Sequence, residues 1–216
     1  MSAIAIIPAR SGSKGIRRKN LRMVGTETLL QQAIRKAKSA CHETIVSSDC
    51  DEILQHAVEH GAVPLKRPLE LSRDDSSSES AIVHAVVELG IRERIVMIQC
   101  TAPFMTVNDI VNCSRPTSAD LSLCCHPFHG FVLDVDGQCI NRTGTPRRQD
   151  MQPQWLVSGS CYSFMPDYLN LPWYSGSIRI VPSEGRYLEI DSTADLKAAQ
   201  ANYDYPLTEE WLEKLN

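Results

Sequence analysis

The segment of residues 6–20, IIPARSGSKGIRRKN, joins a short apolar strand to a loop rich in glycine and positive charge. Residues 3–7 form a continuous apolar run, the pattern of a strand buried on both faces. In residues 9–20, which we call the first loop, Gly12 and Gly15 allow positive φ and a close approach of the backbone to a ligand. Because open α/β sheets bind ligands beyond the carboxyl ends of their strands, this turn predicts an α/β fold with a phosphate site.

The first loop also carries positive charge, on Arg10, Lys14, Arg17, Arg18 and Lys19. The alternative interpretation is a solvated basic loop, since charge runs usually face solvent. The position directly after a buried strand favours phosphate binding instead. The GxxxxGK[ST] and GxGxxG patterns are both absent, so the loop is neither a Walker loop nor a dinucleotide fingerprint.

Composition limits the class of protein. The chain has 216 residues, of which 43% are hydrophobic, enough for one full-sized domain with a core. A net charge of −4 argues against a general nucleic-acid-binding protein, whose surface would be basic throughout. No apolar run approaches the ~20 residues that span a bilayer, and the N-terminus lacks the pattern of a signal peptide. We therefore expect a cytoplasmic protein without membrane or nucleic-acid partners.

Eight cysteines would indicate a disulfide framework only in a short secreted chain. Several lie in apolar strand-like stretches, so we expect buried thiols that pack as small hydrophobic groups. The fragment CCHPFH, residues 124–129, could be considered as a metal site. Adjacent residues of a strand point to opposite faces, however, and no second pair completes four ligands, which favours core cysteines over zinc.

Periodicity divides the rest of the chain into helices and strands. Apolar spacing predicts helices over residues 29–37, 51–60 and 81–89, a helix capped by Thr106 with Asp109, and one from Ser192 to about Tyr203. Short apolar runs predict strands over residues 44–47, 62–65, 95–98, 121–125, 160–164 and 177–181. This order predicts an α/β fold: a Rossmann-like, mostly parallel sheet flanked by helices, in a single domain over residues 1–216.

Helical signals are absent over about residues 127–176, where Asp136 and Gly137 predict a hairpin turn. We therefore expect a small β-rich excursion from the α/β domain, of the kind that forms a lid or a dimer contact. Its candidate anchors are Trp155, Trp173 and Tyr174.

Polar groups that could complete a triphosphate site lie elsewhere in the chain. Glu189 and Asp191 share one face of an extended segment before a capped helix, so both could approach Mg²⁺ held by phosphate. Equally, they could be a solvent-facing strand position and a helix-entry residue. Gln99 ends a buried strand and so faces the ligand edge of the sheet. Residues 147–150, RRQD, are either a solvated charge run or a clamp for an anionic substrate.

Taken in order, these segments resemble the acylneuraminate cytidylyltransferase family over nearly the whole chain. The family pattern IPARGGSKGIPRKN is matched by residues 7–20 except at Ser11 and Arg17. Partial matches to four further family motifs comprise Arg67, Pro68, Glu70, Leu71, Asp74, Ser77 and Ser78; Gln99, Thr101 and Pro103; residues 147–149; and residues 189–192.

The resemblance implies a nucleotidyltransferase with Mg²⁺ as cofactor, CTP and a small acidic acceptor as substrates, and a homodimeric state. It implies nucleotide contacts from Ala9, Arg10, Ser13, Lys14, Gly15, Lys19, Asn20, Arg67 and Ser78. It implies catalytic roles for Arg10, Lys19 and Asp191, metal binding by Asp191 and Glu189, and acceptor contacts from Gln99, Arg148 and Tyr162. In this reaction the acceptor hydroxyl attacks the α-phosphorus and pyrophosphate leaves, so catalysis consists mostly of positioning and charge neutralisation.

The departures from the family pattern gather on the acceptor side. Cys100 stands in place of a proline, Met105 and Leu156 in place of arginines, and Ser158 in place of an asparagine. Loss of two cations and an amide predicts an altered acceptor. The leading interpretation is CMP transfer to a nonulosonic acid such as a sialic, legionaminic or pseudaminic acid. The alternatives are transfer to another small anion such as a phosphonate, or a non-catalytic nucleotide-binding homologue, which the longer side chain of Glu189 would favour.

Overall fold

The computed structural model describes residues 3–12, 15–73, 75–142, 144 and 147–203. Its strands are β1 (Ala3–Pro8), β2 (Met23–Val24), β3 (Glu27–Thr28), β4 (Glu43–Ser48), β5 (Val63–Lys66), β6 (Arg94–Ile98), β7 (Leu121–Phe128), β8 (Gln154–Phe164) and β9 (Ile178–Pro182). Its helices are α1 (Leu29–Ala40), α2 (Asp51–Glu59), α3 (Ser78–Leu89), α4 (Val107–Ser114) and α5 (Thr193–Asn202). Short 3₁₀ helices cover Lys19–Leu21, Leu69–Leu71, Arg148–Asp150 and Pro166–Asn170.

Within the described residues, seven strands form one sheet in the order β5-β4-β1-β6-β8-β7-β9. Strands β5, β4, β1 and β6 run parallel, so the carboxyl ends of these four strands lie at the same edge of the sheet. Strand β8 then pairs antiparallel with β6 and β7, and β9 pairs parallel with β7. The predicted Rossmann-like, mostly parallel sheet flanked by helices is confirmed. Strand β6 has the parallel strand β1 on one side and the antiparallel strand β8 on the other.

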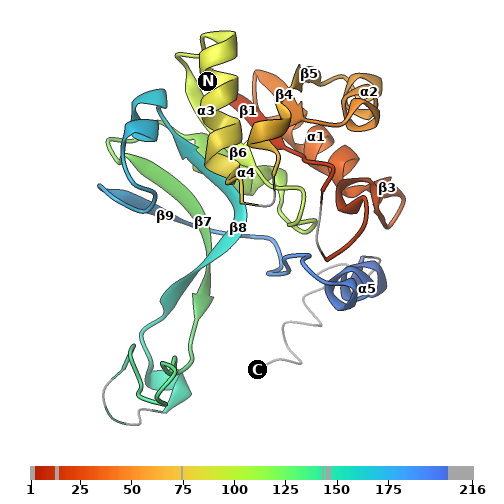
Figure 1. Ribbon diagram of the computed structural model, residues 1–216. Helices are drawn as coiled ribbons and strands as arrows, with labels where there is room; N and C mark the ends of the chain where they lie inside the picture. Colours follow the sequence, from red (N-terminus) through yellow and green to blue (C-terminus); the bar gives the residue numbers. More distant parts are fainter. Residues whose placement is uncertain (1–2, 13–14, 74, 143, 145–146, 204–216) are drawn as a thin grey trace.

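Helices cover both faces of the sheet (Figure 1). On one face, alternate residues such as Ile7 and Val96 pack with buried side chains of α1, α2 and α4. On the other face, Ile6 and Met97 pack against α3. The apolar strands face hydrophobic cores on both sides because each successive side chain points to the opposite face.

The adjacent cysteines Cys124 and Cys125 follow the same rule. Cys124 belongs to the core that contains Ile7, and Cys125 to the core that contains Ile6. The eight cysteines are free thiols, and most of them are buried, as the sequence predicted.

Two predicted helix starts are confirmed by their hydrogen bonds. The Thr106 side chain accepts from the backbone N–H of Asp109, and the Asp109 side chain accepts in return from the backbone N–H of Thr106. Ser192 and Asp195 form the same reciprocal pair at the start of α5. Each pair satisfies two amides that a helix N-terminus leaves without partners.

Strands β7 and β8 continue beyond the sheet as a two-stranded arm that carries residues 129–153, a segment we call the lobe (Figure 1). The register shifts between Leu123 and Cys125, where the arm leaves the sheet. Within the lobe, an isolated bridge joins Leu133 to Cys139 around the predicted turn at Gly137. The expected excursion of residues 127–176 is therefore shorter, because residues 161–164 of β8 pair with β6 inside the main sheet.

Among the helices of the described residues, none is both long and apolar enough to cross a membrane.

Candidate active site

A cleft of about 360 Å³ lies beyond the carboxyl ends of the parallel strands. It brings together residues from the first loop, from the segment before α3, from the turn after β6 and from the segment before α5. The lining residues are Pro8, Arg10, Gly15, Lys19, Asn20, Arg67, Leu71, Ser76, Ser77, Ser78, Thr101 and Asp191. The cleft thus unites most of the residues that the sequence assigned to the nucleotide and the catalytic centre.

The first loop is held in place by contacts with the neighbouring strand end. Asp49 follows β4, which runs parallel to β1, so its carboxylate lies beside the loop. It accepts hydrogen bonds from the backbone N–H of Ser11 at 2.8 Å and from the Ser11 hydroxyl at 2.5 Å. Burial acts to raise the pKa of Asp49, but these bonds hold it below its usual value, so the group is a carboxylate. Ser11, which replaces a glycine of the family pattern, therefore has a structural partner.

Sequence reasoning missed Asp49, although its position gave a usable signal. A polar residue directly after a parallel strand lies at the ligand edge of the sheet, as Gln99 does after β6. A second contact lies within the first loop, where the buried Asn20 side chain donates to the Arg10 carbonyl at 3.0 Å. The sequence predicted that Asn20 belongs to the site but not that it bonds to Arg10. Asn20 therefore shapes the loop from within as well as lining the cleft.

Lys19 joins the first loop to the segment before α5. Its Nζ donates to the Ile190 carbonyl at 2.8 Å and lies 3.1 Å from Asp191 Oδ1. The Lys19 side chain is 15% exposed, whereas that of Asp191 is 73% exposed. The cation is therefore largely buried, and the carboxylate lies on the solvent side of the cleft. Two groups distant in sequence thereby form an ion pair at the cleft, where a phosphate charge would compete for the lysine.

The segment that carries Asp191 is itself fixed at both ends. The Ile190 N–H donates to the Thr101 carbonyl at 2.8 Å, which ties the segment to the turn after β6. The Asp191 N–H donates to the Asp195 carboxylate at 3.1 Å. Ile190 is fully buried while Glu189 and Asp191 are not, so the predicted alternation of side chains is present.

Glu189 is half-buried beside Gly159, which leaves room for the carboxylate because it has no Cβ. Burial, and next the charge of Asp191, raise the pKa of Glu189. A cation close to both carboxylates would stabilise their charged forms and lower the pKa of Glu189. Two carboxylates with oxygen donors beside a phosphate-binding loop form a donor set that suits Mg²⁺.

Arg67 is the most deeply buried cation of the cleft, at 3% exposure. Burial lowers the pKa of Arg67, and its buried Nε and Nη2 atoms have no hydrogen-bond partner among the described residues. A buried guanidinium with unpaired donors is costly unless a ligand satisfies them. Beside it, Ser76, Ser77 and Ser78 form the start of α3, where Ser77 accepts from the Ser80 N–H. This end of the cleft is built to receive a polar ligand.

Of the described residues predicted to bind a ligand or metal, five do not line this cleft: Ala9, Gln99, Arg148, Tyr162 and Glu189. Ala9 is buried, and its N–H donates to the Ser47 carbonyl at 2.9 Å. Gln99 is tied to β8 through its N–H, which donates to the Ser160 carbonyl at 2.9 Å.

Tyr162 is buried on β8, where its ring meets Trp173 edge-on with centroids 5.7 Å apart. Arg148 begins a 3₁₀ helix of the lobe and is not among the residues that line the cleft. Ser13 and Lys14 lie outside the described residues. The acceptor contacts of Gln99, Arg148 and Tyr162 therefore stay predictions.

Most of the side chains that depart from the family pattern are buried against other parts of this chain. Cys100 and Met105 are buried in the core, and burial raises the pKa of the Cys100 thiol to about 12. Ser158 is also buried; its hydroxyl donates to the Cys124 carbonyl at 2.8 Å. Leu156 is exposed on the arm that leads to the lobe. Met105, Leu156 and Ser158 thus replace two arginines and an asparagine of the family pattern without adding a charged group.

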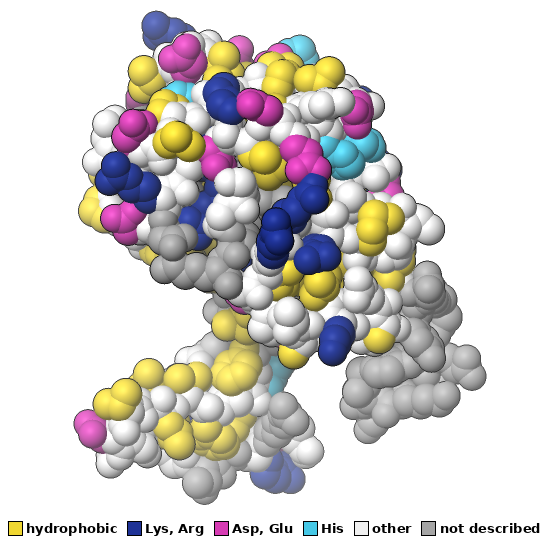
Figure 2. Space-filling view, turned by 45° about the vertical axis from the view of Figure 1, so that its right-hand side comes forward, with side chains coloured by type: hydrophobic (Ala, Val, Ile, Leu, Met, Phe, Trp, Pro, Cys, Tyr) yellow, Lys and Arg dark blue, Asp and Glu magenta, His cyan; other side chains and the backbone are white. Residues whose placement is uncertain are grey.

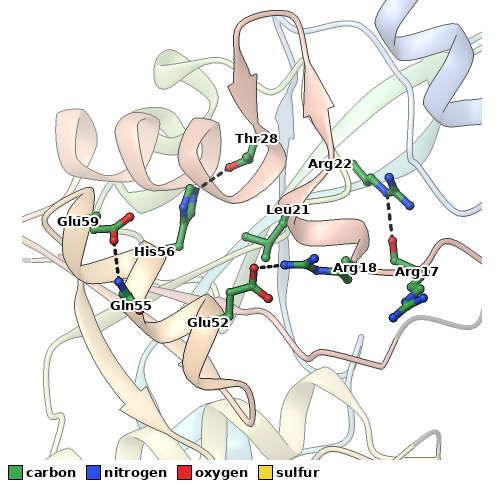
Figure 3. A pocket seen from close by; sticks show the side chains of 9 residues that line it. All are labelled: Arg17, Arg18, Leu21, Arg22, Thr28, Glu52, Gln55, His56 and Glu59. Carbon is green, nitrogen blue, oxygen red and sulfur yellow. Dashed lines mark hydrogen bonds and ion pairs between the residues drawn. The ribbon is translucent and has the colours of Figure 1, made fainter.

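A larger pocket of about 770 Å³ lies on the other side of the first loop (Figure 3). It is lined by Arg17, Arg18, Leu21, Arg22, Thr28, Glu52, Gln55, His56 and Glu59. Turning this side of the molecule forward shows Lys and Arg side chains gathered beside carboxylate and histidine groups (Figure 2). Arg18 adopts a left-handed conformation (φ 57°) and pairs with Glu52. Lys19, Arg67 and Asp191 all line the smaller cleft and none of them lines the larger pocket. We call the smaller one the nucleotide cleft, after the residues that the sequence predicts to bind the nucleotide.

Comparison with known proteins agrees with this geometry. A model of the cytidylyltransferase family matches residues 4–120. The N-acylneuraminate cytidylyltransferase of Escherichia coli O18:K1:H7 is 39% identical over 110 residues, which cover 50% of this chain and 26% of that protein. The CMP-N,N'-diacetyllegionaminic acid synthase of Legionella pneumophila is 34% identical over 115 residues, which cover 48% of each chain. The chain thus spans about half, or less, of the length of these relatives.

Solved structures share the fold at low sequence identity. A CMP:2-keto-3-deoxy-manno-octonic acid synthetase complexed with CTP superposes with a TM-score of 0.72 at 16% identity, covering 94% of this chain and 98% of that one. The 4-diphosphocytidyl-2C-methyl-D-erythritol synthase of Anaerococcus prevotii gives a TM-score of 0.67 at 14% identity, covering 94% and 99%. The resemblance drawn from the motifs is confirmed. Because the family model covers more than half of the 216 residues, this chain belongs to the cytidylyltransferase family.

Proposed function

We propose that this protein transfers CMP from CTP to a nonulosonic, sialic-type acid with release of pyrophosphate. The observation that carries the proposal is the convergence of Arg10, Lys19, Arg67 and Asp191 on one cleft at the ligand edge of the sheet. The matched relatives named above support the same reaction, since they are named for N-acylneuraminate and N,N'-diacetyllegionaminic acid.

The cleft suggests a division of roles along its length. At one end, Arg67 and Ser78 would recognise the cytidine, because the buried guanidinium has donors to offer. At the other end, Lys19 would exchange part of its contact with Asp191 for the α-phosphate and stabilise the charge that develops there. Arg10 would bind phosphate from the first loop; its Nη1 now donates to the Arg73 carbonyl at 2.8 Å.

Asp191 and Glu189 would hold Mg²⁺, which neutralises phosphate charge and orients the leaving pyrophosphate when bound. Their donor set supports this assignment, and so does the raised pKa of Glu189, which a nearby cation would lower. The extra methylene of Glu189 is accommodated at Gly159, where a Cβ would lie 2.7 Å from its carboxylate.

We also propose a homodimer in which the lobe of one copy contacts the other. Large apolar side chains are exposed on the lobe, where hydrophobic groups gather in Figure 2; they include Phe131, Leu133, Val135 and Ile140. Exposed apolar patches of this kind commonly mark protein interfaces. In such a dimer, Arg148 could reach the acceptor of the partner's cleft. Sedimentation velocity tests the state, and a monomer at micromolar concentration would contradict it.

The reaction is tested by incubating the protein with CTP, MgCl₂ and a panel of acids while pyrophosphate is measured. Release with neuraminic, legionaminic or pseudaminic acid supports the proposal. Release with phosphonates alone would keep CMP transfer but reject the sialic-type acceptor. CTP binding without release for any acid, and without rescue in Glu189→Asp, would indicate a non-catalytic homologue.

A further inference from the structure

The end of α2 carries a cluster of metal-ligating side chains outside the nucleotide cleft. His56, Glu59 and His60 each offer one ligand atom, and these atoms all lie within 4.8 Å of one another. Glu59 and His60 follow His56 by three and four residues, and His60 is the C-cap residue of α2. The two histidines are partly buried and Glu59 is exposed, so the cluster is open to ions from solvent.

A hydrogen bond fixes which nitrogen His60 presents. Its Nδ1 lies 2.7 Å from the backbone carbonyl of His56. Because a carbonyl only accepts hydrogen bonds, Nδ1 carries the proton, and the lone pair of the neutral ring is on Nε2. The two imidazole rings lie 4.3 Å apart, centroid to centroid, with a tilt of 43°.

His56 and Glu59 also have partners that orient them (Figure 3). His56 Nε2 lies 2.9 Å from the hydroxyl of Thr28, the cap residue of α1. When Nε2–H donates to this hydroxyl, the lone pair of His56 is on Nδ1. Glu59 Oε1 accepts from Gln55 Nε2 at 3.0 Å. Protein metal ligands are commonly held in this way, with a hydrogen bond on the atom that does not bind the metal.

The donor set points to a class of metal. Two imidazole nitrogens and one carboxylate oxygen suit Zn²⁺, Co²⁺, Ni²⁺ or Cu²⁺, whereas Mg²⁺ prefers oxygen donors alone. We propose that His56, Glu59 and His60 bind a divalent transition metal ion of the Zn²⁺ type, separate from the ion expected in the nucleotide cleft.

The geometry requires only small adjustments. At metal–ligand distances of about 2.0–2.2 Å, tetrahedral ligand atoms are about 3.4 Å apart. One potential ligand atom from each of the three side chains already lies within 4.8 Å of the others, so side-chain rotation can bring the set together. His56 and Glu59 also line the 770 Å³ pocket, which gives the ion a path and leaves room for water or an anion on its remaining positions.

The test is titration of the full chain with ZnCl₂ by calorimetry under reducing conditions. A visible absorption spectrum with CoCl₂ reports the ligands, because cobalt bound to imidazole and carboxylate lacks the intense thiolate charge-transfer bands. We expect one zinc site whose affinity falls by about 100-fold or more in His56→Ala and His60→Ala, since even residues behind the ligands change metal affinity by about 10–100-fold. Glu59→Gln, which preserves the helix, should weaken binding by about 10-fold or more.

The matched control is His42→Ala, which removes an exposed histidine outside the cluster and should leave zinc affinity unchanged. Circular dichroism establishes that each variant remains folded. Absence of zinc binding by the wild-type chain would overturn the proposal. So would equal affinity in the wild type, His56→Ala, His60→Ala and Glu59→Gln, because the metal would then be held by the thiols or by the nucleotide cleft. Neither result depends on CTP turnover.

Discussion

Substitution of Gly15 by alanine tests the contact that closes the nucleotide cleft. A Cβ added to Gly15 would lie 2.2 Å from the Asp191 carbonyl oxygen, a separation that real Cβ atoms essentially never show. The Asp191 segment cannot easily move away, because its neighbour Ile190 is bonded to Thr101 and Asp191 itself to Asp195. The first loop and this segment must therefore separate by about 1 Å.

The displacement should reduce activity more than stability. Overpacking of this size costs about 1–3 kcal/mol, which lowers the thermal midpoint of a domain of this length by roughly 2–12 °C. Lys19 and Asp191 meet at the same junction, and a misplacement of about 1 Å can cost about 100-fold in rate. We expect Gly15→Ala to lower kcat/KM for CTP by about 100-fold while the protein remains folded at 25 °C.

Gly12→Ala is the matched control in the same loop. Among the described residues, nothing lies within 4 Å of a Cβ at Gly12, and neither glycine has a positive φ. Gly12→Ala should therefore keep its activity within about threefold, and its thermal midpoint should be unchanged or slightly raised because alanine restricts the unfolded chain. Pyrophosphate release and differential scanning calorimetry measure both effects. Equal activities and midpoints for the two variants would refute the close contact between Gly15 and Asp191.

Three further substitutions test separate parts of the argument. Lys19→Ala should lower kcat by about 100-fold or more with little change in CTP affinity, because the lysine acts on charge that develops in the transition state; an unchanged kcat in steady-state assays would remove it from catalysis. Asp191→Asn should abolish Mg²⁺-dependent turnover without unfolding the protein, because its side chain is largely exposed; turnover at normal MgCl₂ would contradict the assignment. Lys36 donates to the Pro103 carbonyl, and burial lowers the pKa of Lys36 to about 8. Between pH 8 and about 10.5, Lys36 therefore binds a proton more readily in the unfolded chain than in the folded one. The free energy of unfolding of the wild type should rise over this pH range by roughly 3 kcal/mol more than that of Lys36→Met. Urea denaturation measures both, and an equal pH dependence in the two proteins would exclude the effect.

Elements whose signals are local were predictable from the sequence. The first strand, the reciprocal caps at Thr106 and Ser192, and the glycine-rich first loop each depend on residues close together in the chain. A strand position and a cap are set by side-chain periodicity and by hydrogen bonds over three residues. The family motifs also allowed predictions for residues distant in sequence. Arg67, Ser78 and Asp191 were predicted to share a site with the first loop, and they line one cleft with residues of that loop.

The order of strands beyond β6 was not predictable in the same way. Strand β8 enters between β6 and β7 although β7 precedes it in sequence, and its inner half belongs to the main sheet. The apolar run of residues 160–164 fits either an excursion or a core strand, because periodicity reports which faces are buried and not which neighbour covers the edge. The excursion was therefore predicted too long.

The sequence by itself determined the local conformations and the chemistry available: a buried strand, a basic glycine-containing turn, two carboxylates on one face, and an acceptor side without its usual cations. The tertiary structure decided which of these groups meet. Asp49 accepts hydrogen bonds from Ser11, Gly15 contacts the Asp191 carbonyl, and two of the Arg67 donor atoms have no partner among the described residues. The reason is physical, since such contacts join residues far apart along the chain, and the folding of the whole sheet alone brings their backbone segments within hydrogen-bonding distance.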